Sequence, residues 1–217
     1  AHTLESAART VECAERTGMI FMVAQNYRYR PMITAMKQII SSGRYGKPGQ
    51  AAIAFYKGPH FGGFREEMPY PLIIDMSIHH FDLMRFFLDN DPVSVFGRSW
   101  NPPWSWYKGD ASASVTLEFM NNVFVSYNGS WCSQGREIGW NAHWRFECER
   151  GVVFMEDDVV YTQPTGGAPA IRRDPSCSCR SSIQRSAAVR PESEKDVRQA
   201  LPSASSKAKS IRRPGGS

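Results

Sequence analysis

One short segment of the sequence combines residue types and spacing that suggest catalysis. Asp75, His79 and Asp82 follow one another at intervals of four and three residues. On a helix these intervals place the three side chains on one face. Two flanking carboxylates favour the charged form of an imidazole, raise its pKa and can orient it as a general base. This spacing is therefore compatible with His79 as a general base that Asp75 and Asp82 assist.

Two other interpretations fit the same residues. In the first, Asp75 caps the start of a helix and His79 is a core histidine with satisfied hydrogen bonds. In the second, Asp75, His79 and Asp82 are metal ligands. No further Cys or His cluster completes a zinc site, so we rank the metal interpretation last and predict no metal.

A second polar group occupies residues 25–30, directly after the continuous apolar run of residues 19–24. Such a run is typical of a strand buried on both faces. Ligands of open α/β sheets bind at the carboxyl ends of strands, so Asn26 and Arg28 are well placed to meet one. On composition alone, an ordinary loop with solvated arginines explains the segment equally well.

The elements that must position these residues begin with a helix. Thr3 can cap it, Gly18 can end it, and its apolar residues repeat at helical spacing. We expect its apolar face to point inward. A helix that leads directly into a buried strand is the closing unit of a parallel α/β sheet. Residues 1–25 are therefore predicted to be the last helix–strand unit of a Rossmann α/β domain.

Residues 26–165 have a different pattern, with two helices over residues 32–40 and 72–88 and a loop over residues 58–71. Short alternating strands are predicted over residues 50–56, 93–99, 112–119, 123–130, 143–149 and 152–156. Short turns between successive strands indicate antiparallel pairing. The predicted fold class is therefore α+β, an open, mostly antiparallel sheet with helices packed on one face, preceded by the Rossmann unit.

The net charge of +5 lies in the last part of the chain, because residues 166–217 hold 11 Lys and Arg against four Asp and Glu. All aromatic residues lie at or before Tyr161. Nucleic-acid surfaces combine basic and stacking residues, so we predict no nucleic-acid partner. Residues 166–217 hold too few large aliphatic residues for a core, and we predict a disordered or non-native tail.

Composition also bounds the environment of the protein. The longest purely apolar run has six residues, against the roughly 18 that span a bilayer, so no membrane partner is predicted. Five scattered cysteines fit a reducing compartment better than a disulfide framework. The expected location is the cytoplasm.

The order of these segments resembles the Gfo/Idh/MocA family, the glucose–fructose oxidoreductase and inositol dehydrogenase group. Residues 23–31 are similar to the family's sheet-exit segment, and residues 42–46 resemble its turn before the substrate domain. The most specific piece is the D-x-x-x-H-x-x-D pattern of residues 75–82, followed by L-M-R-F-F-L at 83–88, which is similar to the active-site helix. The resemblance covers residues 1–162.

The resemblance implies an oxidoreductase that uses NAD or NADP to interconvert a hydroxyl and a carbonyl on a sugar or polyol. His79 would be the general acid or base, and Asp75 would contact substrate or set the charge of His79. Asp82 would hold the helix and imidazole in place, while Asn26 and Arg28 would lie near the nicotinamide and substrate. The family also implies a homo-oligomer formed through the sheet face.

The departures from the family pattern are equally specific. The glycine-rich dinucleotide fingerprint and the Glu-Lys-Pro segment are absent from these residues. We therefore expect a fragment with weak or no NAD(P) binding and no turnover alone. The alternative function is a non-catalytic sugar-binding or assembly module, which would use the sheet face and the six tryptophans.

Overall fold

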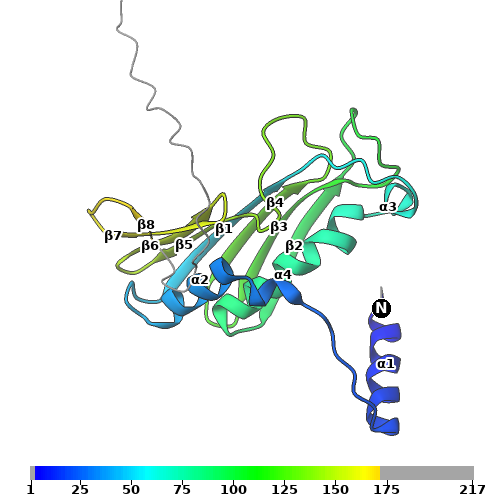
Figure 1. The fold of residues 1–217 in the computed structure, drawn as a ribbon, viewed down its shortest axis with the longest axis horizontal. Coiled ribbons are helices and arrows are strands. Elements are labelled where there is room, and N and C mark those ends of the chain that lie inside the picture. Colours follow the sequence, from blue (N-terminus) through cyan, green and yellow to red (C-terminus); the bar gives the residue numbers. More distant parts are fainter. Residues whose placement is uncertain (1–2, 172–217) are drawn as a thin grey trace, which may run out of the picture. The chain divides into compact units, whose positions relative to one another are not determined.

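The computed structural model describes residues 3–171 of the 217-residue chain. Its helices are α1 (Leu4–Thr17), α2 (Pro31–Ser41), α3 (Phe64–Glu67) and α4 (Ile78–Leu88), with a 3-10 turn η1 (Asn26–Tyr29) and a π-helical turn η2 (Leu72–Ser77). Its strands are β1 (Pro48–Tyr56), β2 (Pro92–Trp100), β3 (Ser112–Phe119), β4 (Phe124–Ser130), β5 (His143–Cys148), β6 (Gly151–Glu156), β7 (Val159–Pro164) and β8 (Ala170–Ile171). Figure 1 shows these elements along the chain.

The strands form one open sheet in the order β2-β3-β4-β1-β5-β6-β7-β8. Every neighbouring pair is antiparallel except β1 and β4, which are parallel. In the centre of the sheet, Ile53 of β1 lies opposite Tyr127 of β4 and Trp144 of β5. The predicted fold class, a mostly antiparallel open sheet with helices on one face, is confirmed.

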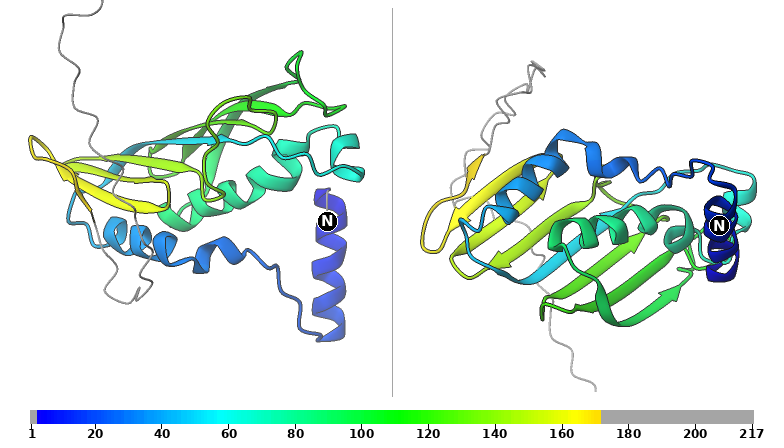
Figure 2. Two further views of the ribbon diagram at one scale, coloured as in Figure 1. Left: turned by 45° about the horizontal axis from the view of Figure 1, so that its top comes forward. Right: turned by 90° about the horizontal axis from the view of Figure 1, so that it is seen from below.

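Helices α2 and α4 lie on the same face of the sheet, as both views in Figure 2 show. Pro31 favours the start of α2, because its fixed φ suits the first helical turn and it has no N–H to satisfy. The core lies between these helices and the sheet. Its largest fully buried side chains include Ile33, Met36, Leu72, Leu83 and Phe87 from the helices and Ile53, Phe55, Tyr127, Trp144 and Phe146 from the strands.

No described helix covers the opposite face of the sheet. Strand alternation turns Tyr56, Phe96, Trp100 and Phe124 toward this face, and each is more than a third exposed. We call this surface the uncovered face. It combines large apolar side chains with a regular backbone, which is unusual for a surface that meets only water.

The first helix is confirmed at both ends. Thr3 accepts a hydrogen bond from the backbone N–H of Ser6, and Gly18 ends the helix with a φ of 65°. The expected burial of its apolar face is wrong, because α1 has no buried residue.

The predicted strand over residues 19–24 is also wrong. The segment has no strand pairing in the structure, and Ile20 is fully exposed. A buried strand needs a neighbouring strand on at least one edge and cover on both faces. Within residues 3–171 this segment has neither, so its apolar sequence does not by itself produce a strand.

Three elements lie where the sequence predicted none. Strand β7 follows β6 through a tight turn at Asp157 and Asp158, whose φ angles of 48° and 64° are left-handed. Strand β8 pairs with β7 and occupies residues 170–171, so the predicted tail boundary at 166 is wrong for these two residues. The rest of the tail, residues 172–217, lies outside the described part of the chain.

Helix α3 interrupts the predicted loop over residues 58–71.

Candidate functional site

The predicted catalytic helix is built from two segments with different geometry. Asp75 lies in the π-helical turn η2, whereas His79 and Asp82 lie in the α-helix α4. A π-helical turn has i→i+5 hydrogen bonds, so the rule that residues four apart share one face does not hold across it. The sequence prediction that Asp75 and Asp82 both flank His79 assumed regular α-helical spacing throughout.

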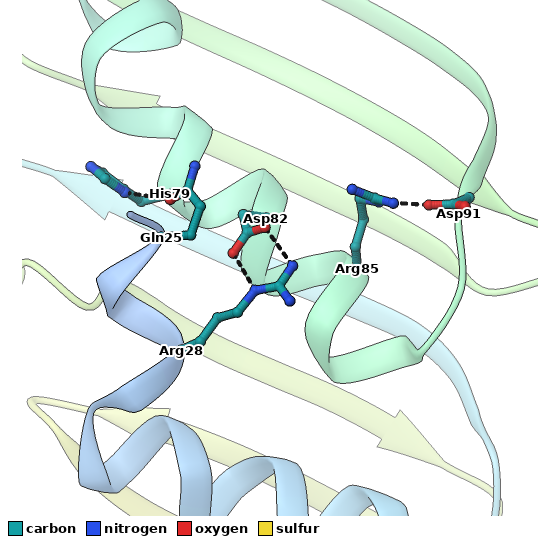
Figure 3. A network of polar contacts seen from close by, with 6 residues as sticks. All are labelled: Gln25, Arg28, His79, Asp82, Arg85 and Asp91. Carbon is teal, nitrogen blue, oxygen red and sulfur yellow. Dashed lines mark hydrogen bonds and ion pairs between the residues drawn. The ribbon is translucent and has the colours of Figure 1, made fainter. Parts of the chain in front are cut away.

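His79 is held by Gln25 and Tyr27. Its Nδ1 lies 2.9 Å from Oε1 of Gln25 (Figure 3). Its ring stacks on Tyr27 with centroids 4.5 Å apart and planes 7° from parallel. An amide oxygen can only accept a hydrogen bond, so Nδ1 of His79 donates. In the neutral imidazole this tautomer leaves the lone pair on Nε2, which can take up a proton.

The net pKa of His79 is lowered, although Asp75 and Asp82 raise it as the sequence predicted. Burial is the largest cause, because it disfavours the charged imidazolium. Asp75 and Asp82 favour the charged form, but Arg30 opposes them, and the net pKa is below 6.5. The ring is therefore neutral, and able to act as a base, at neutral pH.

Asp82 holds an arginine and makes no hydrogen bond to the imidazole. Nε of Arg28 donates to Oδ2 of Asp82 at 2.7 Å, and Nη2 donates to Oδ1 at 2.5 Å (Figure 3). This two-point contact joins η1 to α4 across half-buried side chains. The role of Asp82 in holding the helix and the imidazole in place stays a prediction. Asp82 fixes the segment that carries Gln25 and Tyr27.

Asp75 is likewise paired with an arginine. Nε of Arg65, on α3, donates to Oδ2 of Asp75 at 2.9 Å. The guanidinium of Arg65 also lies over the rings of Phe61 and Phe64. Asp75 therefore fastens the loop that carries α3 to the helix, and it acts on His79 through space and not through a hydrogen bond.

The core histidine is His80. This side chain is fully buried, with Nδ1 3.2 Å from the hydroxyl of Tyr127 and Nε2 3.4 Å from the carbonyl oxygen of Trp140. The hydroxyl of Ser77 lies 2.9 Å from that of Tyr127 and completes the network. Burial lowers the pKa of His80 to about 3, so the ring is neutral. The alternative of a satisfied core histidine thus describes His80, the residue that the sequence prediction passed over.

A pocket of about 710 Å³ brings together three of the predicted site residues. Asn26, Arg28 and Asp82 line it, together with Met22, Val23, Ala24, Gln25, Tyr29 and Arg85. His79 and Asp75 do not line it. Gln25 connects the two sites, because it lines the pocket and also binds His79. Sequence reasoning noted the polar run at 25–30 but did not single out Gln25.

The tryptophans are divided between core and surface. Trp131 and Trp144 are fully buried, whereas Trp100 and Trp104 are exposed. The exposed pair lines a pocket of about 340 Å³, together with Tyr56 of β1.

Two properties of the described residues bear on other classes of site. Among residues 3–171, no three His, Cys, Asp or Glu side chains come close enough together to hold a metal ion. Within the same residues, no helix combines the length and the apolar character that a membrane crossing requires.

Comparison with known proteins identifies the family. Residues 33–154 match the family described as the GFO/IDH/MocA C-terminal domain. The chain is 27% identical over 148 residues to 1,5-anhydro-D-fructose reductase of Ensifer adhaerens, covering 66% of this chain and 44% of the reductase. It is 30% identical over 133 residues to scyllo-inositol 2-dehydrogenase (NAD(+)) of Bacillus subtilis, covering 54% of this chain and 35% of the dehydrogenase.

A solved structure supports the fold. An oxidoreductase from Agrobacterium radiobacter, in complex with NAD+, L-tartaric acid and magnesium, matches with a TM-score of 0.72 at 22% identity. The match covers 79% of this chain and 51% of the oxidoreductase. The chain thus spans about half the length, or less, of these similar proteins.

Proposed function

Because the chain belongs to the family of GFO/IDH/MocA C-terminal domains, we propose that it provides the substrate half of an NAD(P)-dependent oxidoreductase. The reaction interconverts a hydroxyl and a carbonyl on a sugar, a polyol or a related small molecule. The names of its relatives, a sugar-derivative reductase and an inositol dehydrogenase, support this substrate class.

The observation that carries the proposal is the state of His79. Its Nδ1 is engaged by Gln25, its ring plane is fixed by Tyr27, and its pKa is lowered by burial. Nε2 can therefore take the proton of a substrate hydroxyl during oxidation and return it to the alkoxide during reduction. A positioned general base of this kind typically contributes about 10²–10⁴-fold in rate. The bound nicotinamide supplies the other half of the chemistry, as acceptor or donor of the hydride.

The 710 Å³ pocket fits the nicotinamide end of the cofactor. The carboxamides of Gln25 and Asn26 can both donate to and accept from the nicotinamide carboxamide, and Met22 and Val23 offer apolar surface to the ring. Arg28 lines the same pocket, but its guanidinium is already bound to Asp82. The fit is confined to this end, because the sequence contains no G-x-G-x-x-G turn to cradle a pyrophosphate.

The test supplies the chain with a nicotinamide-binding partner half. The 217-residue chain is fused behind the N-terminal half of the Ensifer adhaerens reductase, and turnover of polyols and ketoses is followed by NAD(P)H absorbance. We expect His79→Gln to lower kcat by about 10²–10⁴-fold while NAD(P)H binding is retained. His143→Gln is the matched control, because His143 lies on β5 and contacts Asp157.

Two results would contradict the proposal. An active fusion in which His79→Gln turns over as fast as the parent would remove the role of His79. A folded fusion that binds NAD(P)H but oxidises or reduces none of these substrates would favour the non-catalytic module.

We also propose that two copies of the chain associate through the uncovered face. The exposed Phe96, Trp100 and Phe124 support this, since association would bury apolar surface that otherwise meets water. Light scattering is expected to give a dimer or larger assembly, and Phe96→Ser is expected to weaken it. Phe64→Ser, at an equally apolar exposed residue on α3, is the control. A monomer at every concentration would contradict this proposal.

A further inference from the structure

Tyr27 is stacked between His79 and a cation. The Cζ atom of Arg30 lies 3.6 Å from the centre of the Tyr27 ring, and the imidazole of His79 lies 4.5 Å from the same centre in a nearly parallel plane. Both groups are in contact with one ring, and they would overlap if they shared a face. The guanidinium and the imidazole therefore occupy opposite faces of Tyr27.

Arg30 is held in place by the loop before β5 and by the β6–β7 turn. Its Nη1 donates to Oδ1 of Asn141, and Nδ2 of Asn141 donates to Oδ1 of Asp158 at 2.6 Å. The backbone oxygen of Asn141 accepts a hydrogen bond from Nε1 of Trp144 at 2.6 Å. The loop before β5 and the β6–β7 turn thus hold the guanidinium against Tyr27.

Arg30 also differs from the other arginines near His79 in having no direct counter-charge. Arg28 is paired with Asp82, and Arg65 is paired with Asp75. Among residues 3–171, no carboxylate lies within ion-pair distance of Arg30, and Asp158 reaches it only through Asn141. Among the described arginines near His79, Arg30 is therefore the one whose charge is not paired directly with a carboxylate.

We propose that Tyr27 and Arg30 are positioning residues for His79. The phenol ring fixes the plane of the imidazole, and the guanidinium behind it keeps the imidazole in its neutral, proton-accepting form. This inference rests on the proposed role of His79 as the base, and it adds the residues that set the pH range in which that base works. Nothing in the pattern D-x-x-x-H-x-x-D contains this information, because Tyr27 and Arg30 precede it by about fifty residues.

The groups that face His79 shift its pKa in both directions. Burial and the charge of Arg30 lower its pKa, while Asp75 and Asp82 raise it. The adjacent His80 is neutral, Gln25 is uncharged, and Tyr27 has a raised pKa because it is buried. Arg30 is thus the cation whose charge lowers the pKa of His79.

The test measures protonation directly in the 217-residue chain. The imidazole Cε1–H resonance of His79 is followed by NMR as pH is varied, and it is assigned by its loss in His79→Gln. Arg30→Gln keeps a hydrogen-bond donor for Asn141 but removes the charge, and we expect the pKa of His79 to rise. Arg30→Lys keeps the charge and is expected to restore most of the original value. Arg44→Met is the matched control, because Arg44 stacks on Tyr45 and its charge does not contribute to the pKa shift of His79.

A second variant gives a shift of opposite sign and does not disturb Arg30 itself. Asp158 occupies a left-handed turn position that asparagine tolerates, and Asp158→Asn keeps an acceptor for Asn141 while removing the negative charge behind Arg30. We expect the pKa of His79 to fall. Unchanged titration of His79 in folded Arg30→Gln and Asp158→Asn would overturn the inference, whatever the outcome of the activity test.

The catalytic consequence is read from the fusion enzyme. In alcohol oxidation, Arg30→Gln is expected to move the acidic limb of kcat/KM to higher pH, with a loss of roughly threefold on that limb and little change on the plateau. Tyr27→Leu removes the stacked ring and is expected to lower kcat at all pH values, whereas Tyr27→Phe keeps it. A uniform loss in Arg30→Gln at every pH would indicate a structural role only and would contradict the inference.

Discussion

His79 and His80 are neighbours in the sequence, yet the two sides of α4 give them opposite surroundings. His80 faces the sheet, where Tyr127 and the backbone of Trp140 use both of its ring nitrogens. His79 faces η1, where Gln25 uses one nitrogen and leaves the other available. A helix turns by about 100° per residue, so the two histidines point in different directions, although Tyr27 lies beside both rings. The ring of His80 therefore contributes to the stability of the core, whereas Nε2 of His79 is available for the proposed proton transfer.

The largest expected difference between them is in stability. His80→Ala removes a fully buried ring, leaves a cavity and takes one of two hydrogen-bond partners from the hydroxyl of Tyr127, so we expect a loss of about 2–4 kcal/mol in the free energy of unfolding. His79→Ala is expected to cost less than about 1 kcal/mol, because the side chain is only half-buried. Urea denaturation measures both. Equal losses would break the comparison.

The acid sensitivity of the fold should follow His80. Its pKa is about 3 when folded and 6.5 when free, so the unfolded chain binds more protons between these values. Stability is therefore complete above pH 6.5 and declines as pH falls toward 3, by at most roughly 1.4 kcal/mol per pH unit from this group. His80→Phe should flatten this slope. Denaturation at several pH values tests it, and an unchanged slope would assign the acid sensitivity to other groups.

The smallest effect concerns the two Asp–Arg pairs that Figure 3 shows beside His79. Asp82→Asn weakens the half-buried pair with Arg28, and we expect a loss of about 1–2 kcal/mol in the free energy of unfolding. Asp91→Asn weakens the exposed pair with Arg85 and should cost less than about 0.5 kcal/mol. Thermal unfolding compares them. A greater loss in Asp91→Asn would show that burial does not set the strength of these pairs.

The sequence predicted helices α1, α2 and α4 and most strands, because each carries its own periodicity. Helix α4, the strand alternation and the caps of α1 are local properties. Strand β7 was not predicted, because its turn is Asp-Asp and not a glycine-containing pair, although both turn residues have left-handed φ angles. The false strand at residues 19–24 shows the reverse case, in which an apolar run lacks the neighbours that its prediction assumed.

The sequence named several residues of the candidate site but did not predict which side chains bind one another. His79, Asp75, Asp82 and Arg28 were all named, yet each carboxylate binds an arginine from outside residues 75–82. These pairings depend on how η1 and α3 pack against the helix, and no spacing within residues 75–82 encodes them. The π-helical geometry of η2 is equally invisible to a rule that assumes 3.6 residues per turn.

The single parallel pair in the sheet has a consequence for how the protein folds. Strands β2, β3 and β4 form one run of antiparallel neighbours, β5 to β8 form another, and β1 lies between them. Each run can assemble from contacts close in sequence, whereas β1 must wait for β4, which follows it only after α3, α4, β2 and β3. Insertion of β1 is therefore expected to be the late, rate-limiting step. Ile53→Pro, in the middle of β1, is expected to let β2–β4 and β5–β8 form as separate sheets and to prevent β1 from joining them.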